Sequence, residues 1–91
     1  MKIKQSSVCG SLESSDIMIM LSPAENGIEI QLKSIVMTQF GDAIEAVIIQ
    51  VLEENGIEDV CVDATDRGAL DCTIRARMET AIARALNEVA S

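Results

Sequence analysis

The stretch Ile28-Glu29-Ile30-Gln31-Leu32-Lys33 is the clearest indication of the fold in this chain. Apolar and polar residues alternate along it, which is typical of a β-strand with one face on a core and the other in water. Apolar residues then recur at the three- and four-residue spacing of one helical face, namely Met37, Phe40, Ile44, Val47, Ile48, Val51 and Leu52. We therefore expect a strand at residues 28–33 and a helix at residues 35–54, with Ser34 as its cap and Asn55-Gly56 as its stop.

Upstream of this unit lies a second strand candidate, the apolar run at residues 17–21, which ends at Ser22-Pro23. The pair Asn26-Gly27 tolerates positive φ and lets the chain reverse. The two strands are therefore predicted to pair as an antiparallel hairpin. Residues 2–8 have a weaker strand pattern, because their serines favour local turns.

Downstream, residues 60–64 are predicted to form a further short strand, and Asp66-Arg67-Gly68 is predicted to form a turn. A second helix follows from Leu70, with one apolar face formed by Ile74, Met78, Ala81, Ile82, Ala85, Leu86 and Val89. The predicted order is strand, strand, strand, helix, strand, helix. This order favours an α+β fold, a small mainly antiparallel sheet of about four strands with two helices packed on one face. The length of 91 residues allows a single domain, residues 1–91.

Composition excludes several classes of function. The chain has 15 acidic and 7 basic residues and a net charge of −8, so its field repels nucleic acid and anionic membrane surfaces. No apolar run reaches the roughly 20 residues that span a bilayer, and the N-terminal residues do not resemble a signal peptide. We expect a cytoplasmic protein that binds neither nucleic acid nor membranes.

The chain contains no histidine, which removes the side chain most often used for proton transfer near neutral pH. Cys9, Cys61 and Cys72 form no CxxC pair, so we expect no metal site and interpret these cysteines as small buried residues. No catalytic residue is predicted, and an autonomous enzyme is disfavoured.

Residues 10–16, Gly-Ser-Leu-Glu-Ser-Ser-Asp, place three hydroxyls beside two carboxylates in a segment with weak helix and strand patterns. We expect an exposed loop. By composition alone it is an ordinary polar turn, in which Asp16 and the serines bind nearby backbone amides. A serine nucleophile would need a base, for which the candidates are Lys2, Lys4, Lys33 or a carboxylate.

Four sequence blocks stand in order along the chain. They are Met1-Lys2-Ile3, residues 10–16, Gln39-Phe40-Gly41-Asp42-Ala43-Ile44, and Gly68-Ala69-Leu70-Asp71-Cys72 followed by Ile74-Arg75-Ala76-Arg77. Together they resemble the citrate lyase acyl carrier protein family, also called the gamma chain, over nearly the full length. The last block is the most specific of the four.

The resemblance implies that Ser14 carries 2'-(5''-phosphoribosyl)-3'-dephospho-CoA through a phosphodiester. Ser15 stands where the family often has glycine. By this resemblance the arm's thiol bears acetyl and citryl groups, and the partners are a transferase (alpha) subunit, a lyase (beta) subunit and the prosthetic-group transferase that loads the carrier. The chain itself would then be a non-catalytic carrier subunit in the cleavage of citrate to acetate and oxaloacetate.

The two later blocks also have structural interpretations. Phe40 and Ile44 fit a core face, and Gly68 fits a turn before a helix, so neither block is predicted as a binding site. Alternatively they shape the surface under the arm, which alanine substitutions at Asp42 and Asp71 would test. The acidic side of the first helix is either a solvated surface or a docking surface for basic partners.

Two other functions remain open from the sequence. A malonate decarboxylase carrier uses the same kind of arm, but we do not expect it to show the block at residues 68–72 so plainly. A small α+β regulatory or oligomerisation module without a covalent group would suit the acidic face and apolar helices equally well.

Overall fold

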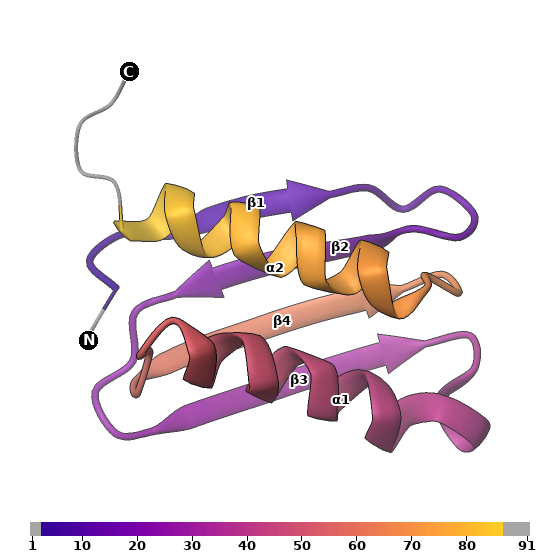
Figure 1. Cartoon of the computed structure of the whole chain (residues 1–91), viewed down its shortest axis with the longest axis horizontal. Helices are drawn as coiled ribbons and strands as arrows, with labels where there is room; N and C mark the ends of the chain where they lie inside the picture. The colour runs from indigo at the N-terminus through magenta and orange to yellow at the C-terminus, as the bar shows by residue number, and fades with distance from the viewer. Residues whose placement is uncertain (1–2, 87–91) are drawn as a thin grey trace.

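The computed structural model describes residues 3–86, in which strands and helices follow the predicted order. The elements are β1 (Ser7–Gly10), β2 (Ile17–Ser22), β3 (Ile28–Ser34), α1 (Met37–Glu54), β4 (Val60–Asp66) and α2 (Asp71–Leu86). Both helices lie on the same face of the sheet, α2 over β1 and β2, and α1 over the β3 side (Figure 1). The predicted α+β class and its layers are confirmed.

The sheet is mixed, with the strand order β1-β2-β4-β3. β1 pairs with β2 and β2 with β4 in antiparallel fashion, whereas β3 and β4 run parallel. The hairpin predicted from Asn26-Gly27 is therefore wrong, because β4 lies between the two strands. The turn instead contacts the start of β4, where Gly27 N donates to Asp59 Oδ1 at 2.7 Å and Val60 N donates to Gly27 O at 3.0 Å.

Burial explains why β4 takes a central position. Val60, Val62 and Ala64 are fully buried, as are Ile17, Ile19 and Leu21 of β2. β3 is only half-buried on its inner side and forms an edge of the sheet. Pairing β2 with β4 at the centre of the sheet places both of these buried rows away from its edges and out of the reach of water.

The first strand is displaced from its predicted position at residues 2–8, of which residue 2 lies outside the described part of the chain. Strand pairing begins only at Ser7, whose Oγ donates to Ala81 O of α2 at 2.7 Å. Arg84 Nη1 donates to Val8 O at 2.7 Å. These bonds to α2, rather than the sequence pattern, determine where β1 begins. Ile3 still joins the core, at 4% exposure.

Helix α1 begins at Met37, two residues later than predicted, and Ser34 does not cap it. Ser34 Oγ accepts from Val36 N at 3.0 Å and donates to Asp66 Oδ2 at 2.7 Å, so it binds the turn before the helix to the end of β4. The predicted stop is confirmed, since Asn55 follows the last helical residue and Gly56 adopts φ +70°.

Two predictions of burial are wrong. Phe40 was expected on the core face with Ile44, yet its side chain is 55% exposed while Ile44 is buried. Among the cysteines, Cys9 is buried, Cys61 is half-buried and Cys72 is exposed. Phe40 lies in the first turn of α1, and the helical spacing that places Ile44 in the core does not bury it there.

Within residues 3–86, no helix combines the length and the apolar character that crossing a bilayer requires. The same residues contain no group of three or more potential metal ligands close enough to hold an ion.

Candidate functional site

Ser14, the predicted attachment residue, lies in the loop of residues 11–16 between β1 and β2. Its side chain is exposed, and within residues 3–86 its hydroxyl has no hydrogen-bond partner. The hydroxyl is therefore free to be covalently modified without disturbing the core. The loop is at the same end of the molecule as the β3–α1 and β4–α2 connections (Figure 1).

The loop is held in place on both sides of Ser14. Ser15 N donates to Arg67 O at 2.8 Å, and Arg67 N donates to Asp16 O at 2.8 Å. Ser15 has φ +63°, in the left-handed region that glycine adopts without cost. This conformation gives a physical reason why a glycine would suit position 15.

Asp16 anchors the loop to α2 through a two-pronged ion pair. Arg77 Nε donates to Asp16 Oδ1 at 3.0 Å, and Arg77 Nη2 donates to Asp16 Oδ2 at 2.9 Å. Ser11 Oγ adds a bond to Oδ2 at 2.6 Å, and Ile17 N adds one to Oδ1 at 2.7 Å. The hydrogen bond from Arg77, followed by that from Ser11, lowers the pKa of Asp16 from 3.8 to about 2. The carboxylate therefore stays charged and bound at neutral pH.

The lysines considered as bases do not assemble around Ser14. Lys33 is exposed on β3, which is at the opposite edge of the sheet from β1. Lys4 precedes β1, and Lys2 lies outside the described residues. Besides Arg77, which pairs with Asp16, the cationic residue that contacts the loop is Arg67, whose backbone hydrogen-bonds to Ser15 and Asp16. Its side chain is exposed, and it forms no ion pair within residues 3–86.

A second carboxylate, that of the buried Asp66, joins the other two connections at this end. Asp66 is 1% exposed and accepts bonds from Ser34 Oγ, Gly68 N and Ala69 N, at 2.7, 3.1 and 3.0 Å respectively. It therefore fixes the β4–α2 loop against the start of α1. Because Arg67 lies between Asp66 and Gly68, the same short segment also contacts the Ser14 loop.

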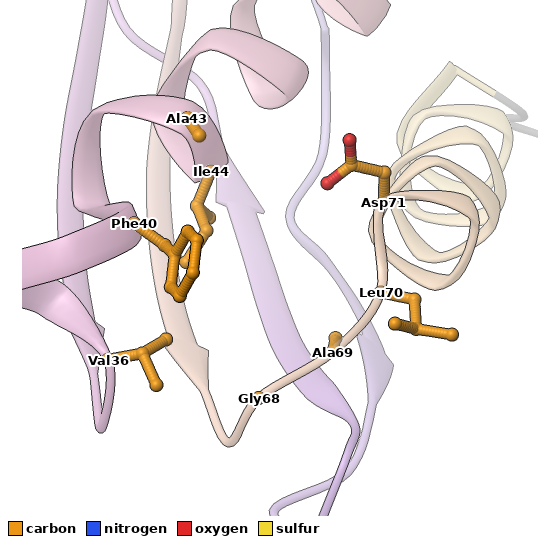
Figure 2. Close-up of a pocket in the computed structure, with 8 residues that line it drawn as sticks. All are labelled: Val36, Phe40, Ala43, Ile44, Gly68, Ala69, Leu70 and Asp71. Atoms are coloured by element: carbon orange, nitrogen blue, oxygen red, sulfur yellow. The ribbon is translucent and has the colours of Figure 1, made fainter.

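Residues at the start of α1 and in the β4–α2 connection line a mainly apolar pocket of about 370 Å³ (Figure 2). The α1 side contributes Val36, Phe40, Ala43 and Ile44. The loop and first turn of α2 contribute Gly68, Ala69, Leu70 and Asp71. The two blocks that the sequence left as structural are thus brought together in one cavity. Asp71 lines it, whereas Asp42 does not.

Comparison with known proteins places this geometry in a family. The chain is 56% identical over 85 residues to the citrate lyase acyl carrier protein of Lacticaseibacillus casei (strain BL23), covering 93% of this chain and 84% of that one. It is 52% identical over 89 residues to the citrate lyase acyl carrier protein of Weissella paramesenteroides, covering 98% and 92% of the two chains. The chain belongs to the citrate lyase acyl carrier protein family. A family model described as ACP, malonate decarboxylase delta subunit (MdcD), also matches residues 4–85.

A solved structure shares the fold of this citrate lyase acyl carrier protein family member. It is a chain of a Pseudomonas malonate decarboxylase hetero-tetramer in complex with malonate, with a TM-score of 0.80 at 19% identity, covering 92% of this chain and 87% of that one. At this identity the likeness establishes the fold alone. It shows that the mixed sheet with two helices on one face also occurs in a decarboxylase complex.

Sequence reasoning missed two structural features of the site. Arg77 lies 61 residues from Asp16 in the chain, and Asp66 lies 32 residues from Ser34, so neither bond follows from local pattern. The available signal for the first bond was the resemblance itself, because Arg77 ends a matched block, whereas Ser34 and Asp66 lie outside all four blocks.

Proposed function

We propose that this chain is the acyl carrier subunit of a citrate lyase and that Ser14 holds 2'-(5''-phosphoribosyl)-3'-dephospho-CoA through a phosphodiester. The observation that carries the proposal is the exposed Ser14 hydroxyl on a loop bound at Ser15 and Asp16, in a chain more than half identical to named citrate lyase carriers. When bound, the group supplies a thiol that carries acetyl and citryl groups as thioesters.

The choice of Ser14 over Ser15 is supported by the loop geometry. Ser15 is committed to a left-handed backbone and to the bond with Arg67 O. Both hydroxyls are exposed, but the backbone of Ser14 makes no hydrogen bond within residues 3–86, so it can adjust to a transferase without breaking the bond between Ser15 and Arg67. An anchored loop with an exposed tip is suited to a modification site, because the scaffold stays rigid while the tip stays accessible.

Charge near Ser14 also suits a phosphodiester. Arg67 is exposed and unpaired within the described residues, and its backbone is one hydrogen bond from Ser15. A guanidinium at this position attracts the negative phosphate in a chain of net charge −8. Asp16 does not compete for Arg67, because its carboxylate is bound to Arg77.

The chain is proposed to act as one carrier domain that catalyses nothing by itself. Its partners are the alpha (transferase) and beta (lyase) subunits, and the prosthetic-group transferase that loads Ser14, all in the cytoplasm. Tethering raises the local concentration of the carried group at each partner's site, which a free thiol at ordinary concentration does not match.

Mass spectrometry of protein made together with its modifying enzymes tests the assignment. The wild-type chain should gain the mass of the arm on the peptide containing Ser14. Ser14→Ala should remain unmodified and fold normally, with stability changed by less than about 0.5 kcal/mol, because the side chain is exposed.

Ser15→Gly is the matched control. Glycine relieves the positive φ but raises the entropy of the unfolded chain, so its stability should lie within about 1 kcal/mol of wild type. It should be modified as fully as wild type. An arm found on Ser15, or an unfolded Ser14→Ala, would contradict the assignment.

A malonate decarboxylase carrier is the second candidate, because the matching family model and the similar fold both come from that system. Reconstitution separates the two. Modified protein should restore citrate cleavage to carrier-depleted citrate lyase and should not restore malonate decarboxylation to a carrier-depleted decarboxylase. The reverse result would favour the second candidate.

A further inference from the structure

The pocket between α1 and the β4–α2 loop has a lining that is unusual for this chain. Phe40 is the only aromatic residue in the sequence, and it lines this pocket with its side chain 55% exposed instead of filling the core. Ile44 forms the buried wall beside it. Figure 2 shows the ring of Phe40 facing open space between α1 and the β4–α2 loop. A flat apolar group can therefore pack against it.

The pocket is a near neighbour of Ser14. On the β4–α2 side the first lining residue is Gly68. The residue before it is Arg67, which is hydrogen-bonded to Ser15 and Asp16. The backbone from Arg67 to Leu70 spans at most about 11 Å even when extended. A nucleotide joined to Ser14 is therefore close to the pocket, because Arg67 contacts the Ser14 loop and the next residue, Gly68, lines the pocket.

We propose that this pocket holds the purine ring of the nucleotide attached to Ser14, stacked on Phe40 while the carrier is between partners. This inference rests on the proposed function, because the purine belongs to the group proposed for Ser14. It assigns a resting site to that group on the carrier itself, through Phe40, Ile44 and Asp71.

The lining fits a purine in size and in chemistry. A volume of about 370 Å³ lies in the range of small-molecule sites and accommodates one base. The ring face of Phe40 is available for stacking. Proteins commonly bind unpaired bases by stacking them on aromatic side chains, whichever base it is. Asp71 is exposed at the rim, with its carboxylate directed toward the α1 side of the pocket, where it can accept a bond from the exocyclic amine of adenine (Figure 2).

The same lining does not suit the citryl group that the arm carries. Citryl is a polyanion, which Asp71 repels and the apolar wall does not solvate. When the purine is bound in the pocket, the thiol end of the arm lies outside it and remains available to partner enzymes. Because a short tether supplies an effective concentration on the order of millimolar, even a weak site is substantially occupied and still releases the purine readily.

Nuclear magnetic resonance of the modified full chain tests the proposal. Its covalent state is first verified by mass. Apart from the purine H2 and H8 protons, the only carbon-bound aromatic protons should be those of Phe40, because the chain has no Trp, Tyr or His. We expect nuclear Overhauser contacts between the purine protons and the Phe40 ring, and shifts of the Ile44 methyl signals relative to unmodified protein.

Two variants and one control sharpen the test. Phe40→Ala removes the stacking face, and Ala43→Met fills the pocket from an exposed helical position, so each should abolish the contacts and the Ile44 shifts. Met20→Ala removes an equally exposed apolar side chain from the open face of the sheet and should leave both unchanged. The second pocket variant decides the matter if the first folds poorly.

Modified protein without purine contacts in the pocket overturns the proposal, as do contacts confined to residues 11–16. Pocket signals that change only when the transferase subunit is added would assign the pocket to a partner instead, which also overturns it. A chain that carries no arm on Ser14 is recognised in the mass spectrum beforehand. That outcome removes the proposed function and this inference together.

Discussion

Asp16 and Asp66 organise the functional end of the molecule, and each does so by accepting several hydrogen bonds. Asp16 joins the Ser14 loop to α2, and Asp66 joins the end of β3 and the loop before α2 to the end of β4. Neither side chain is part of the proposed chemistry. Their role is positional, because an exposed hydroxyl can be recognised by an enzyme only if the surrounding backbone has a defined shape.

The Asp16–Arg77 pair predicts how stability depends on pH. The pKa of Asp16 is about 2 in the folded chain against a usual value of 3.8, so the folded state binds this proton more weakly than the unfolded state. The contribution of the pair is therefore fully present above about pH 4 and is lost as the pH falls toward about 2. Urea unfolding at a series of pH values should show Asp16→Asn to be less stable than wild type near neutrality, with the gap narrowing as the pH falls.

Asp63→Asn is the control for this series, since Asp63 is exposed on the open face of the sheet and has no ion-pair partner within residues 3–86. Its difference from wild type should be small and nearly independent of pH. A constant gap for Asp16→Asn across the same range would contradict the assigned role of the ion pair.

At the scale of the elements, Gly10 is the last residue of β1, and the Ser14 loop follows it. Gly10 has φ +102°, and a Cβ placed there would lie 1.8 Å from Ile17 O, a backbone atom of β2. Such a contact cannot be relieved by a side-chain rotation. The two strands must therefore move apart if residue 10 carries a side chain.

Gly10→Ala is expected to lower the free energy of unfolding by more than about 3 kcal/mol, because backbone strain and the clash with Ile17 add together. Gly56→Ala is the matched control, with φ +70° but no atom within 4 Å of the added Cβ, and should cost only about 1–2 kcal/mol. Urea denaturation of both variants measures the difference. Equal losses would show that the close approach of β1 and β2 is less tight than described.

At the scale of the whole molecule, the excess of negative charge acts against compactness. Acidic residues outnumber basic ones by 15 to 7. Helix α1 carries Asp42, Glu45, Glu53 and Glu54, of which Glu54 pairs with Arg75 of α2. The remaining charges repel one another across the surface, a cost that salt screens.

Raising sodium chloride from about 0.02 M to about 0.2 M should therefore raise the thermal midpoint, by about 2–5 °C for a domain of this size. A variant with two fewer charges, Asp42→Asn with Glu53→Gln, should show a smaller increase. Circular dichroism at 222 nm follows the melt, because both helices contribute to it. A midpoint that falls with salt would indicate that attractive pairs such as Asp16–Arg77 outweigh the repulsion.

Periodicity and turn residues were enough to predict the sequence of elements, since alternation at residues 28–33 and the helical spacing in α1 and α2 depend only on which side chains must leave water. The resemblance in residues 10–16 also pointed to Ser14. Its exposure agrees with the loop that the sequence predicted. These properties are local, because each depends only on a residue and its near neighbours in the sequence.

Only the tertiary structure decided which strands are neighbours and what surrounds Ser14. The turn at Asn26-Gly27 allowed a hairpin, but β4, whose inner side chains are fully buried, lies between β2 and β3, and its pairing with them joins residues more than thirty positions apart. The displaced start of β1, the exposure of Phe40 and the bond between Asp16 and Arg77 likewise depend on contacts between distant segments. Such contacts produce no periodic pattern in the sequence, because the free energy that favours them comes from the packing of the whole core.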